Sequence, residues 1–269
     1  MENTFLKWAG GKNWFVRYYN NMLPQKYKRY IDPFLGGGSV YFYLEPENAI
    51  ISDINQELIT TFIAIRDNWQ KVYEILKLHS RKHSYEYYYR VRNMKPRTPA
   101  TIAARMIYLN RTCFNGIYRV NRNGEFNVPI GDNTNILLET DKFKERSKIL
   151  QGTQILCQDF EKTIELSQED DFLFCDPPYA VLEENNRFVN YTGQLFNWND
   201  QIRLANCLHK AKERGVKIIM TNVNHAAVRS LYESIDGYKF NEVARFSSIS
   251  GKSVGRKRYK ELIISANID

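Results

Sequence analysis

Apolar and polar residues follow one another along the chain in blocks that predict alternating strands and helices. Short apolar runs bounded by polar or turn-forming residues predict buried strands at residues 30–32, 48–53, 153–157, 172–175 and 216–220. Between these runs, apolar residues recur at helical spacing from residue 56 to about 78 and from 99 to 111. The alternation predicts an α/β fold, with residues 238–245 and 259–266 as a closing antiparallel pair.

The strand predicted at 172–175 runs into Asp176, Pro177, Pro178 and Tyr179. Because proline can neither donate to a strand ladder nor continue a helix, the chain must turn there, at the carboxyl end of a strand. Ligands of open α/β sheets bind at that edge. A carboxylate, turn carbonyls and an aromatic face can together hold the amino group and ring of a base. We interpret these four residues as catalytic candidates; a strand-end turn without chemistry is the alternative.

A glycine-rich turn at residues 34–39 leads from a predicted strand into a predicted helix. Glycine lets the backbone approach a ligand closely, and a helix N-terminus points its N–H groups at that ligand. Asp53 ends the next predicted strand, where a carboxylate can accept both ribose hydroxyls of a nucleoside. Tyr41 stands where a dinucleotide fingerprint requires its third glycine, which argues against NAD. The turn and Asp53 therefore predict a different adenosine-containing cofactor.

Composition limits the classes of protein that the chain can belong to. A hydrophobic content of 43% excludes a disordered chain, and no run of about eighteen apolar residues could span a membrane. Without a signal peptide at the start, we expect a cytoplasmic protein. The four cysteines lack Cys-x-x-Cys spacing, so no zinc site or disulfide framework is expected. His79 and His83 lack a third ligand nearby, so no metal is expected there.

The net charge of +8 favours a polyanionic partner. Between residues 81 and 122, Glu86 is the single acid among ten basic residues, whereas solvated helix faces normally mix signs. We interpret this stretch as a surface that follows DNA phosphates. Near its end, Asn123-Gly124 predicts a β-hairpin whose arginine and asparagine side chains suit a DNA major groove. An ordinary two-stranded ribbon is the alternative. The ten basic residues are Arg81, Lys82, Arg90, Arg92, Lys95, Arg97, Arg105, Arg111, Arg119 and Arg122.

Three segments resemble a known family. Residues 176–179 resemble the catalytic motif of enzymes that methylate adenine at N6 or cytosine at N4, and residues 5–12 and 110–129 closely resemble the Dam-type (alpha-group) DNA adenine-N6 methyltransferases. The resemblance covers nearly the whole chain and implies a class I S-adenosylmethionine-dependent methyltransferase fold, a Rossmann-like α/β sheet with a closing antiparallel hairpin. It implies a catalytic domain at 1–57 and 151–269, and a mostly helical target-recognition insertion at 58–150 that carries a β-hairpin.

The resemblance also implies S-adenosylmethionine as methyl donor. Residues 5–12 would close over it, with Trp8 and Lys12 lining the cofactor site, and Phe160 would stack on its adenine. The cofactor-binding residues implied in this way are Trp8, Gly10, Lys12, Phe34, Gly36, Asp53, Asp159, Phe160 and Asp176.

Double-stranded DNA is the implied partner, with the target adenine flipped out of the duplex. By resemblance, Phe114 would wedge into the vacated stack, Asn115 would contact the partner base, and Arg119 would pair with a guanine through O6 and N7. The family commonly continues with basic residues after Pro129, whereas this chain has Gly131-Asp132-Asn133, which puts a phosphate contact there in question. The implied DNA-binding residues are Lys7, Arg111, Phe114, Asn115, Ile117, Arg119, Asn121, Asn127 and Pro129.

These residues predict a mechanism. The methyl group of S-adenosylmethionine is already activated, so the enzyme mainly positions the reactants. Asp176 and the Pro177 carbonyl would accept the two amino hydrogens and free the nitrogen lone pair for direct attack. No Pro-Cys dipeptide supplies the nucleophile of a cytosine-C5 enzyme.

We therefore expect a monomeric, site-specific DNA adenine-N6 methyltransferase. By resemblance its site is GATC, and a cognate restriction endonuclease can share that site without binding the enzyme. The alternatives are a non-catalytic DNA-binding module on a methyltransferase fold and a methyltransferase of RNA or of a protein amide.

Overall fold

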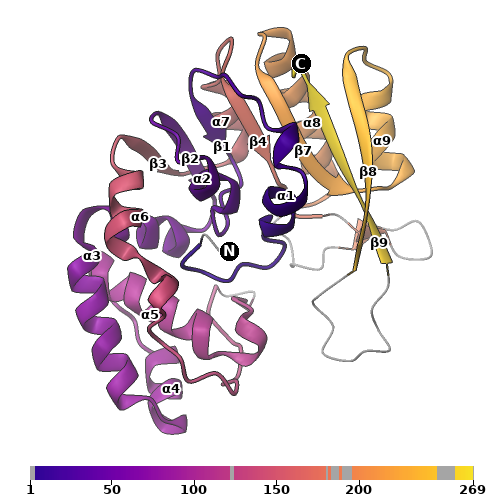
Figure 1. The fold of residues 1–269 in the computed structure, drawn as a ribbon. Coiled ribbons are helices and arrows are strands. Elements are labelled where there is room, and N and C mark those ends of the chain that lie inside the picture. Colours follow the sequence, from indigo (N-terminus) through magenta and orange to yellow (C-terminus); the bar gives the residue numbers. More distant parts are fainter. Residues whose placement is uncertain are drawn as a thin grey trace. The chain divides into compact units, whose positions relative to one another are not determined.

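The computed structural model describes residues 4–121, 124–179, 181–182, 188–189, 196–246 and 258–268 (Figure 1). The chain divides into two compact units, which we describe separately: Met1–Met22 with Leu35–Gln158, and Leu23–Phe34 with Asp159–Asp269. The strand order in the sheet is β3-β2-β1-β4-β7-β9-β8, with β2 and β3 in the first unit. The predicted boundary of the recognition insertion at 58–150 stays a prediction.

The first unit is mostly helical. Its two strands pair in parallel, with Asp53 opposite Cys157, so both strands end at the same edge. The elements are α1 (Asn13–Tyr18), η1 (Asn20–Met22), α2 (Ser39–Leu44), β2 (Ala49–Asp53), α3 (Gln56–Lys82), α4 (Tyr85–Arg92), α5 (Pro99–Thr112), η2 (Phe114–Gly116), η3 (Glu139–Asp141), α6 (Phe143–Leu150) and β3 (Thr153–Cys157).

Local sequence explains where the long helices begin. The Asn55 side chain accepts a hydrogen bond from the Leu58 amide at the start of α3. At the start of α5, Thr98 forms a capping box with Thr101, and Pro99 supplies a preset φ angle. Every residue of α5 from Ala103 to Thr112 is buried, so this helix forms the centre of the unit.

The second unit holds the remaining strands. β1, β4 and β7 are parallel neighbours; β9 runs antiparallel to β7 and pairs with β8. Every residue of β1 and β4 is buried, as parallel strands covered on both faces require. The elements are β1 (Tyr30–Asp32), α7 (Phe160–Glu165), β4 (Phe172–Cys175), β5 (Val181–Leu182), β6 (Phe188–Val189), α8 (Trp198–Glu213), β7 (Lys217–Val223), α9 (Ala226–Glu233), β8 (Tyr238–Phe246) and β9 (Arg258–Ala266).

The predicted fold class is confirmed: the chain has the α/β architecture of class I methyltransferases, with β8 and β9 as the closing antiparallel pair. The predicted hairpin around Asn123-Gly124 is represented by single antiparallel bridges, Val120 with Phe126 and Cys113 with Ile130, while Arg122 and Asn123 lie outside the described residues. Among the helices in the described ranges, none is both long and apolar enough to cross a membrane.

Candidate active site and recognition segment

The strand-end motif at residues 176–179 follows β4 in the second unit. Asp176 is half-buried, and its Oδ1 accepts a hydrogen bond of 2.8 Å from the hydroxyl of Thr221 in β7. The Tyr179 hydroxyl donates to Oε2 of Glu261 in β9 at 3.2 Å. Burial, and then the charges of Asp176 and Glu261, raise the pKa of Tyr179 well above its ordinary value, so the phenol stays a donor at neutral pH.

A second pair of side chains supports the backbone of the same motif. Gln201 in α8 donates from Nε2 to the Pro178 carbonyl at 3.4 Å. The Gln201 oxygen in turn accepts from Nδ2 of Asn222 at 3.1 Å. Gln201 and Asn222 are fully buried, so this short relay fixes the turn from the interior of the unit.

An aromatic cluster brings together two of the predicted cofactor residues in the second unit. The rings of Phe34 and Phe160 are stacked with centroids 5.3 Å apart, and Phe196 meets Phe34 edge-on at 5.8 Å. Phe34 lies two residues after the end of β1, and its amide donates to Oδ1 of the buried Asp32 at 3.0 Å. Asp32 therefore holds the start of the glycine turn, a role that sequence reasoning did not assign.

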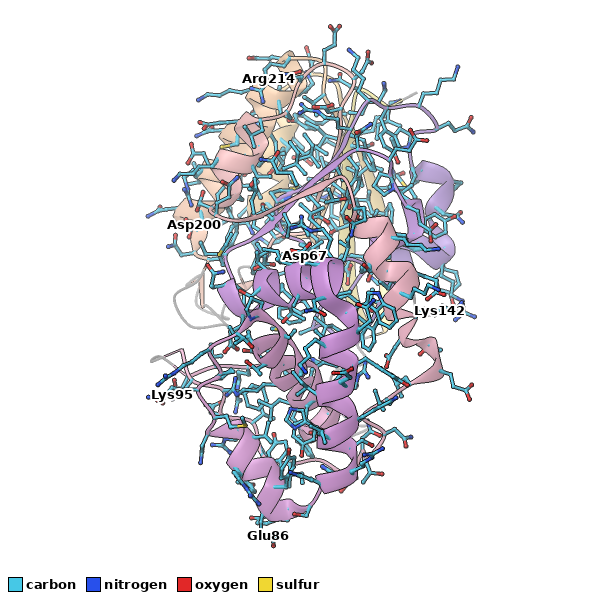
Figure 2. The ribbon with its side chains drawn as sticks, turned by 90° about the vertical axis from the view of Figure 1, so that its left-hand side faces the viewer. Asp67, Glu86, Lys95, Lys142, Asp200 and Arg214 are labelled. Carbon is cyan, nitrogen blue, oxygen red and sulfur yellow. The ribbon has the colours of Figure 1, made fainter. Side chains whose placement is uncertain are left out.

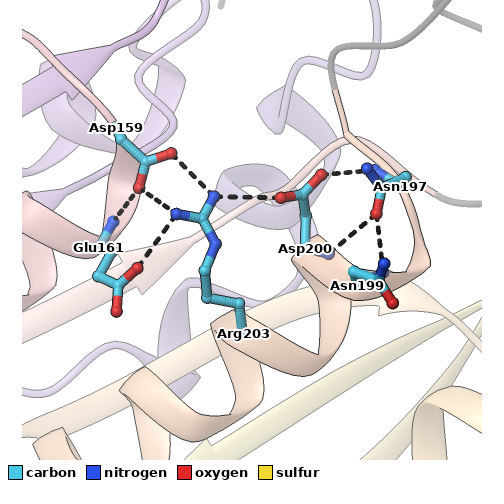
Figure 3. A network of polar contacts seen from close by, with 6 residues as sticks. All are labelled: Asp159, Glu161, Asn197, Asn199, Asp200 and Arg203. Carbon is cyan, nitrogen blue, oxygen red and sulfur yellow. Dashed lines mark hydrogen bonds and ion pairs between the residues drawn. The ribbon is translucent and has the colours of Figure 1, made fainter.

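Asp159, also predicted to bind the cofactor, is part of an ion-pair network (Figure 3). Its two carboxylate oxygens accept from both terminal nitrogens of Arg203, at 3.0 and 2.9 Å, and Oδ1 also caps α7 through the Glu161 amide. Arg203 further pairs with Glu161 and Asp200, and its guanidinium lies 4.3 Å from the centroid of the Phe160 ring. Arg203 thus fixes Asp159 and packs on Phe160, and no motif in the sequence points to it.

In the first unit, the structure brings three predicted cofactor residues together. The Gly36 amide donates to Oδ2 of Asp53 at 3.1 Å. Gly36 has a φ of +49°, and a Cβ there would lie 2.7 Å from Cδ1 of Trp8, so no larger residue fits without displacing the indole. Burial raises the pKa of Asp53, although the amides of Asn55, Gly36 and Ile54 oppose that shift. The carboxylate is placed at the end of β2, as predicted.

The Trp8 indole also packs against the recognition side of the unit. It stacks on Tyr118 with centroids 5.7 Å apart and planes 18° apart. The Tyr118 hydroxyl donates to Glu57 at the start of α3, and Glu57 pairs with Arg105 of α5 at 3.3 Å. Burial and the Glu57 charge raise the pKa of Tyr118, which keeps it protonated. Sequence reasoning missed Tyr118 and Glu57, because no local pattern indicates this contact.

The rest of the segment at residues 5–12 is fixed by short hydrogen bonds. Lys12 is buried, and its ammonium donates to the Gly10 carbonyl at 2.8 Å. The buried Asn110 of α5 accepts from the Lys7 amide at 2.9 Å and donates to the Lys7 carbonyl at 2.7 Å. The Lys7 ammonium reaches the carbonyl of Asn115 at 2.8 Å. Lys7 therefore lies beside the predicted DNA-reading residues.

We call residues 113–131 the recognition segment. Its ends are joined where the Phe114 amide donates to the Pro129 carbonyl at 2.9 Å and the Gly131 amide to the Thr112 carbonyl at 2.8 Å. Phe114 is 53% exposed, and Asn115 and Arg119 are also exposed. Nε of Arg119 donates to Oδ1 of Asn127 at 3.1 Å. Ile117 and Asn121 are half-buried, and Pro129 is exposed. The predicted reading residues are accessible in the described part of the segment.

Two arginines of the basic stretch require a correction. Arg111 was predicted to contact DNA, but it is 7% exposed and forms an internal ion pair with Asp141, donating also to the Phe5 carbonyl at 2.9 Å. Arg105 is equally buried and donates to the carbonyls of Val91 and Arg92. Both stabilise the interior of the first unit, because α5 is buried from Ala103 to Thr112. Lys95, by contrast, is exposed (Figure 2).

The remaining titratable candidates have structural partners. His79 and His83 form hydrogen bonds through Nδ1 with the hydroxyls of Tyr87 and Tyr108, at 2.9 and 2.8 Å. Burial lowers the pKa of His79 to about 4, so it is neutral at physiological pH. The described ranges contain no cluster of three histidine, cysteine or acidic side chains arranged to hold a metal ion.

Residues 8–249 match the model of the D12 class N6 adenine-specific DNA methyltransferase family. A Type II methyltransferase of Methanocaldococcus jannaschii, M.MjaIII, is 37% identical over 277 residues, covering 94% of each chain. A second Type II methyltransferase, M1.LlaDCHI of Lactococcus lactis, is 34% identical, covering 97% of this chain and 94% of the relative. The DNA adenine methylase of Haemophilus influenzae is also 34% identical, covering 97% of this chain and 93% of the relative. With a family model that spans most of its length, this chain belongs to the D12 class of N6 adenine-specific DNA methyltransferases.

Proposed function

We propose that the protein transfers a methyl group from S-adenosylmethionine to N6 of an adenine that it flips out of duplex DNA, at the sequence GATC. The observation that carries the proposal is the support of the strand-end motif, where Thr221 holds Asp176, Gln201 holds the Pro178 carbonyl and Glu261 holds Tyr179. A turn without chemistry would have no need for three buried polar partners, each of which costs desolvation free energy.

The chain's residues fit S-adenosylmethionine. Asp53 suits the ribose hydroxyls, Gly36 lets the Trp8 indole pack against the glycine turn beside Asp53, and the Phe34–Phe160 stack suits a purine ring. When bound, this cofactor supplies a methyl group activated by the sulfonium charge. We assign cofactor binding to Trp8, Gly10, Lys12, Gly36 and Asp53 of the first unit, and to Phe34, Asp159, Phe160 and Asp176 of the second.

The motif's own groups account for activation of the amine. Asp176 and the Pro177 carbonyl accept the two hydrogens of the amino group, which draws the nitrogen lone pair out of conjugation with the ring. Flipping the base costs a few kcal/mol. Stacking on Tyr179, and of Phe114 in the vacated position, returns about 1–3 kcal/mol per base. No covalent intermediate with the protein is needed.

Sequence reading is assigned to the exposed part of the recognition segment. Arg119 suits a guanine because its guanidinium can meet O6 and N7 together. Asn115, Ile117, Asn121, Asn127 and Pro129 are placed on the same segment, and Lys7 lies beside it. Arg111 is left out of this assignment because its guanidinium is buried. We further propose that the enzyme acts as a monomer, with any cognate restriction endonuclease sharing the site without binding the enzyme.

The test is to incubate unmethylated duplex DNA with the protein and S-adenosylmethionine and to map every modified base by single-molecule sequencing. Adenine methylation confined to GATC supports both the chemistry and the site. Adenine methylation in another sequence supports the chemistry and overturns the assigned site. A lack of methylation, with DNA still bound, favours the non-catalytic binding module; modification of RNA or protein alone overturns the DNA substrate.

A further inference from the structure

Two neighbouring strands of the second unit project polar side chains toward the strand-end motif. In the register of β7 and β9, Thr221 pairs with Ile263 and Val223 pairs with Glu261. Because side chains alternate between the two faces of a sheet, Thr221 and Glu261 lie on the same face as diagonal neighbours. Asn222 lies on the opposite face, where it supports Gln201 of α8. The motif is therefore supported through both faces of this strand pair.

Thr221 acts directly on the proposed catalytic carboxylate. Its side chain is fully buried, and its hydroxyl is 2.8 Å from Oδ1 of Asp176 but 3.5 Å from the Cys175 carbonyl. The Tyr179 oxygen is a further neutral acceptor within reach of this hydroxyl. A hydrogen bond to a charged acceptor is roughly twice as strong as one to a neutral acceptor, so the single proton is directed to the carboxylate. This bond fixes the rotation of the carboxylate about its Cβ–Cγ bond.

Glu261 acts on the aromatic member of the motif. It is 6% exposed, in a strand whose other residues from Leu262 to Ala266 are also buried. A charged side chain in that position needs a strong partner to offset its desolvation, and the Tyr179 hydroxyl provides one. Tethering the hydroxyl holds the outer end of the ring in one place, which limits where its face can meet a stacking base.

We propose that Thr221 and Glu261 are positioning residues for methyl transfer: Thr221 orients the Asp176 carboxylate toward the target amino group, and Glu261 orients the Tyr179 ring beneath the target base. The proposal rests on the proposed adenine-N6 activity. It assigns neither residue a contact with the substrate.

The first test compares single-turnover methylation by wild type, Thr221→Val and Thr221→Ser at saturating DNA and S-adenosylmethionine. Valine keeps the shape and removes the hydroxyl, so we expect a rate about 10- to 100-fold lower, the scale of a small misplacement of reacting groups. The dissociation constant for DNA should change by no more than about twofold, because the hydroxyl contacts no substrate. Serine restores the donor and should restore most of the rate.

Thr61→Val is the matched control, because Thr61 is also fully buried but bonds the Glu57 carbonyl at 2.7 Å in the first unit. It should keep the wild-type rate. A Thr221→Val variant as fast as wild type, or a Thr221→Ser variant as slow as Thr221→Val, overturns the role of Thr221. A wild-type protein that methylates no adenine overturns the proposed function and this role with it, so the two failures are distinguishable.

The second test is a double-mutant cycle on Glu261→Leu and Tyr179→Phe, measured on two matched duplexes: one carries 2-aminopurine at the target position and reports base flipping by fluorescence, and the other carries adenine there and reports methyl transfer. Both substitutions remove the hydrogen bond between Tyr179 and Glu261, so the losses in 2-aminopurine fluorescence and in transfer rate should be strongly non-additive. Glu261→Gln keeps an acceptor for the Tyr179 hydroxyl, so its fluorescence and transfer rate should remain close to those of wild type. This variant keeps the role of Glu261 testable even where the leucine variant misfolds. Fully additive losses, or a glutamine variant as defective as leucine, overturn the role of Glu261.

Discussion

The strand-end motif and the recognition segment differ in how their functional side chains are held. Asp176, Tyr179 and the Pro178 carbonyl each have a buried partner from another element of the second unit. Phe114 and Arg119 are exposed, and Arg119 bonds only within its own segment in the contacts described above. This difference fits the roles proposed for them: bond-forming groups gain from rigid placement before the substrate arrives, whereas base-reading groups obtain their partners from the DNA.

The largest expected effect is at the motif. Asp176→Ala should lower the methylation rate by about a thousandfold or more, because a preorganised acceptor of the developing charge is lost. DNA affinity, measured by fluorescence anisotropy, should stay within about twofold of wild type. Asp236→Ala, which removes an exposed acid from the same unit, is the control and should be fully active. Unimpaired turnover of Asp176→Ala would refute the proposed mechanism.

In the recognition segment the effect should be selective. Arg119→Ala should relax discrimination at one base pair by about 1–3 kcal/mol, seen as kcat/KM for duplexes altered at each position in turn. Lys95→Ala provides the contrast. Lys95 is exposed, and removing a lysine that contacts phosphate weakens binding to all DNA sequences alike. An Arg119→Ala enzyme with intact site preference would show that the segment does not read this base pair.

A smaller effect is expected where α5 holds the segment at residues 5–12. Asn110→Ala leaves the amide and carbonyl of Lys7 without their buried partner and should lower the free energy of unfolding by about 1–3 kcal/mol. Urea denaturation measures this loss, and Asn93→Ala, at an exposed asparagine, should be nearly neutral. Equal stability of the two variants would mean that Asn110 does not anchor the segment.

The smallest effect concerns Asp53, which shares features of both regions: its side chain is half-buried, and it is proposed to meet a ligand. Its folded-state pKa is raised by burial, so the charged carboxylate disfavours the folded state at pH 7, and that penalty is relieved as pH falls toward the raised pKa. Asp53→Asn should therefore be slightly more stable than wild type at pH 7, with the difference shrinking near pH 4, an ordinary aspartate pKa. Cofactor affinity, measured by calorimetry, should fall. If the stability advantage of Asp53→Asn over wild type grew as the pH falls, the raised pKa of Asp53 would be contradicted.

Sequence reasoning succeeded where the signal is local. The apolar run before Asp176, its two prolines, and the glycine turn followed by Asp53 specify strand ends without reference to distant residues. It failed where burial depends on packing: Arg111 lies among basic residues, yet the enclosure of α5 makes it internal. Thr221 and Glu261 could have been suspected, since each is polar beside an apolar run, but pairing them with Asp176 and Tyr179 requires the strand register.

The way in which the recognition segment closes on itself bears on how such enzymes diversify. Its entering and leaving backbones are joined between residues 112–114 and 129–131, while Tyr118, Phe126 and Val128 pack or bond inward. The outward positions between these fixed points can change one at a time without disturbing the folded scaffold. With the reading role proposed above, the segment is an exchangeable cassette: substitutions at a few exposed positions would change the target sequence and leave the strand-end motif as it is.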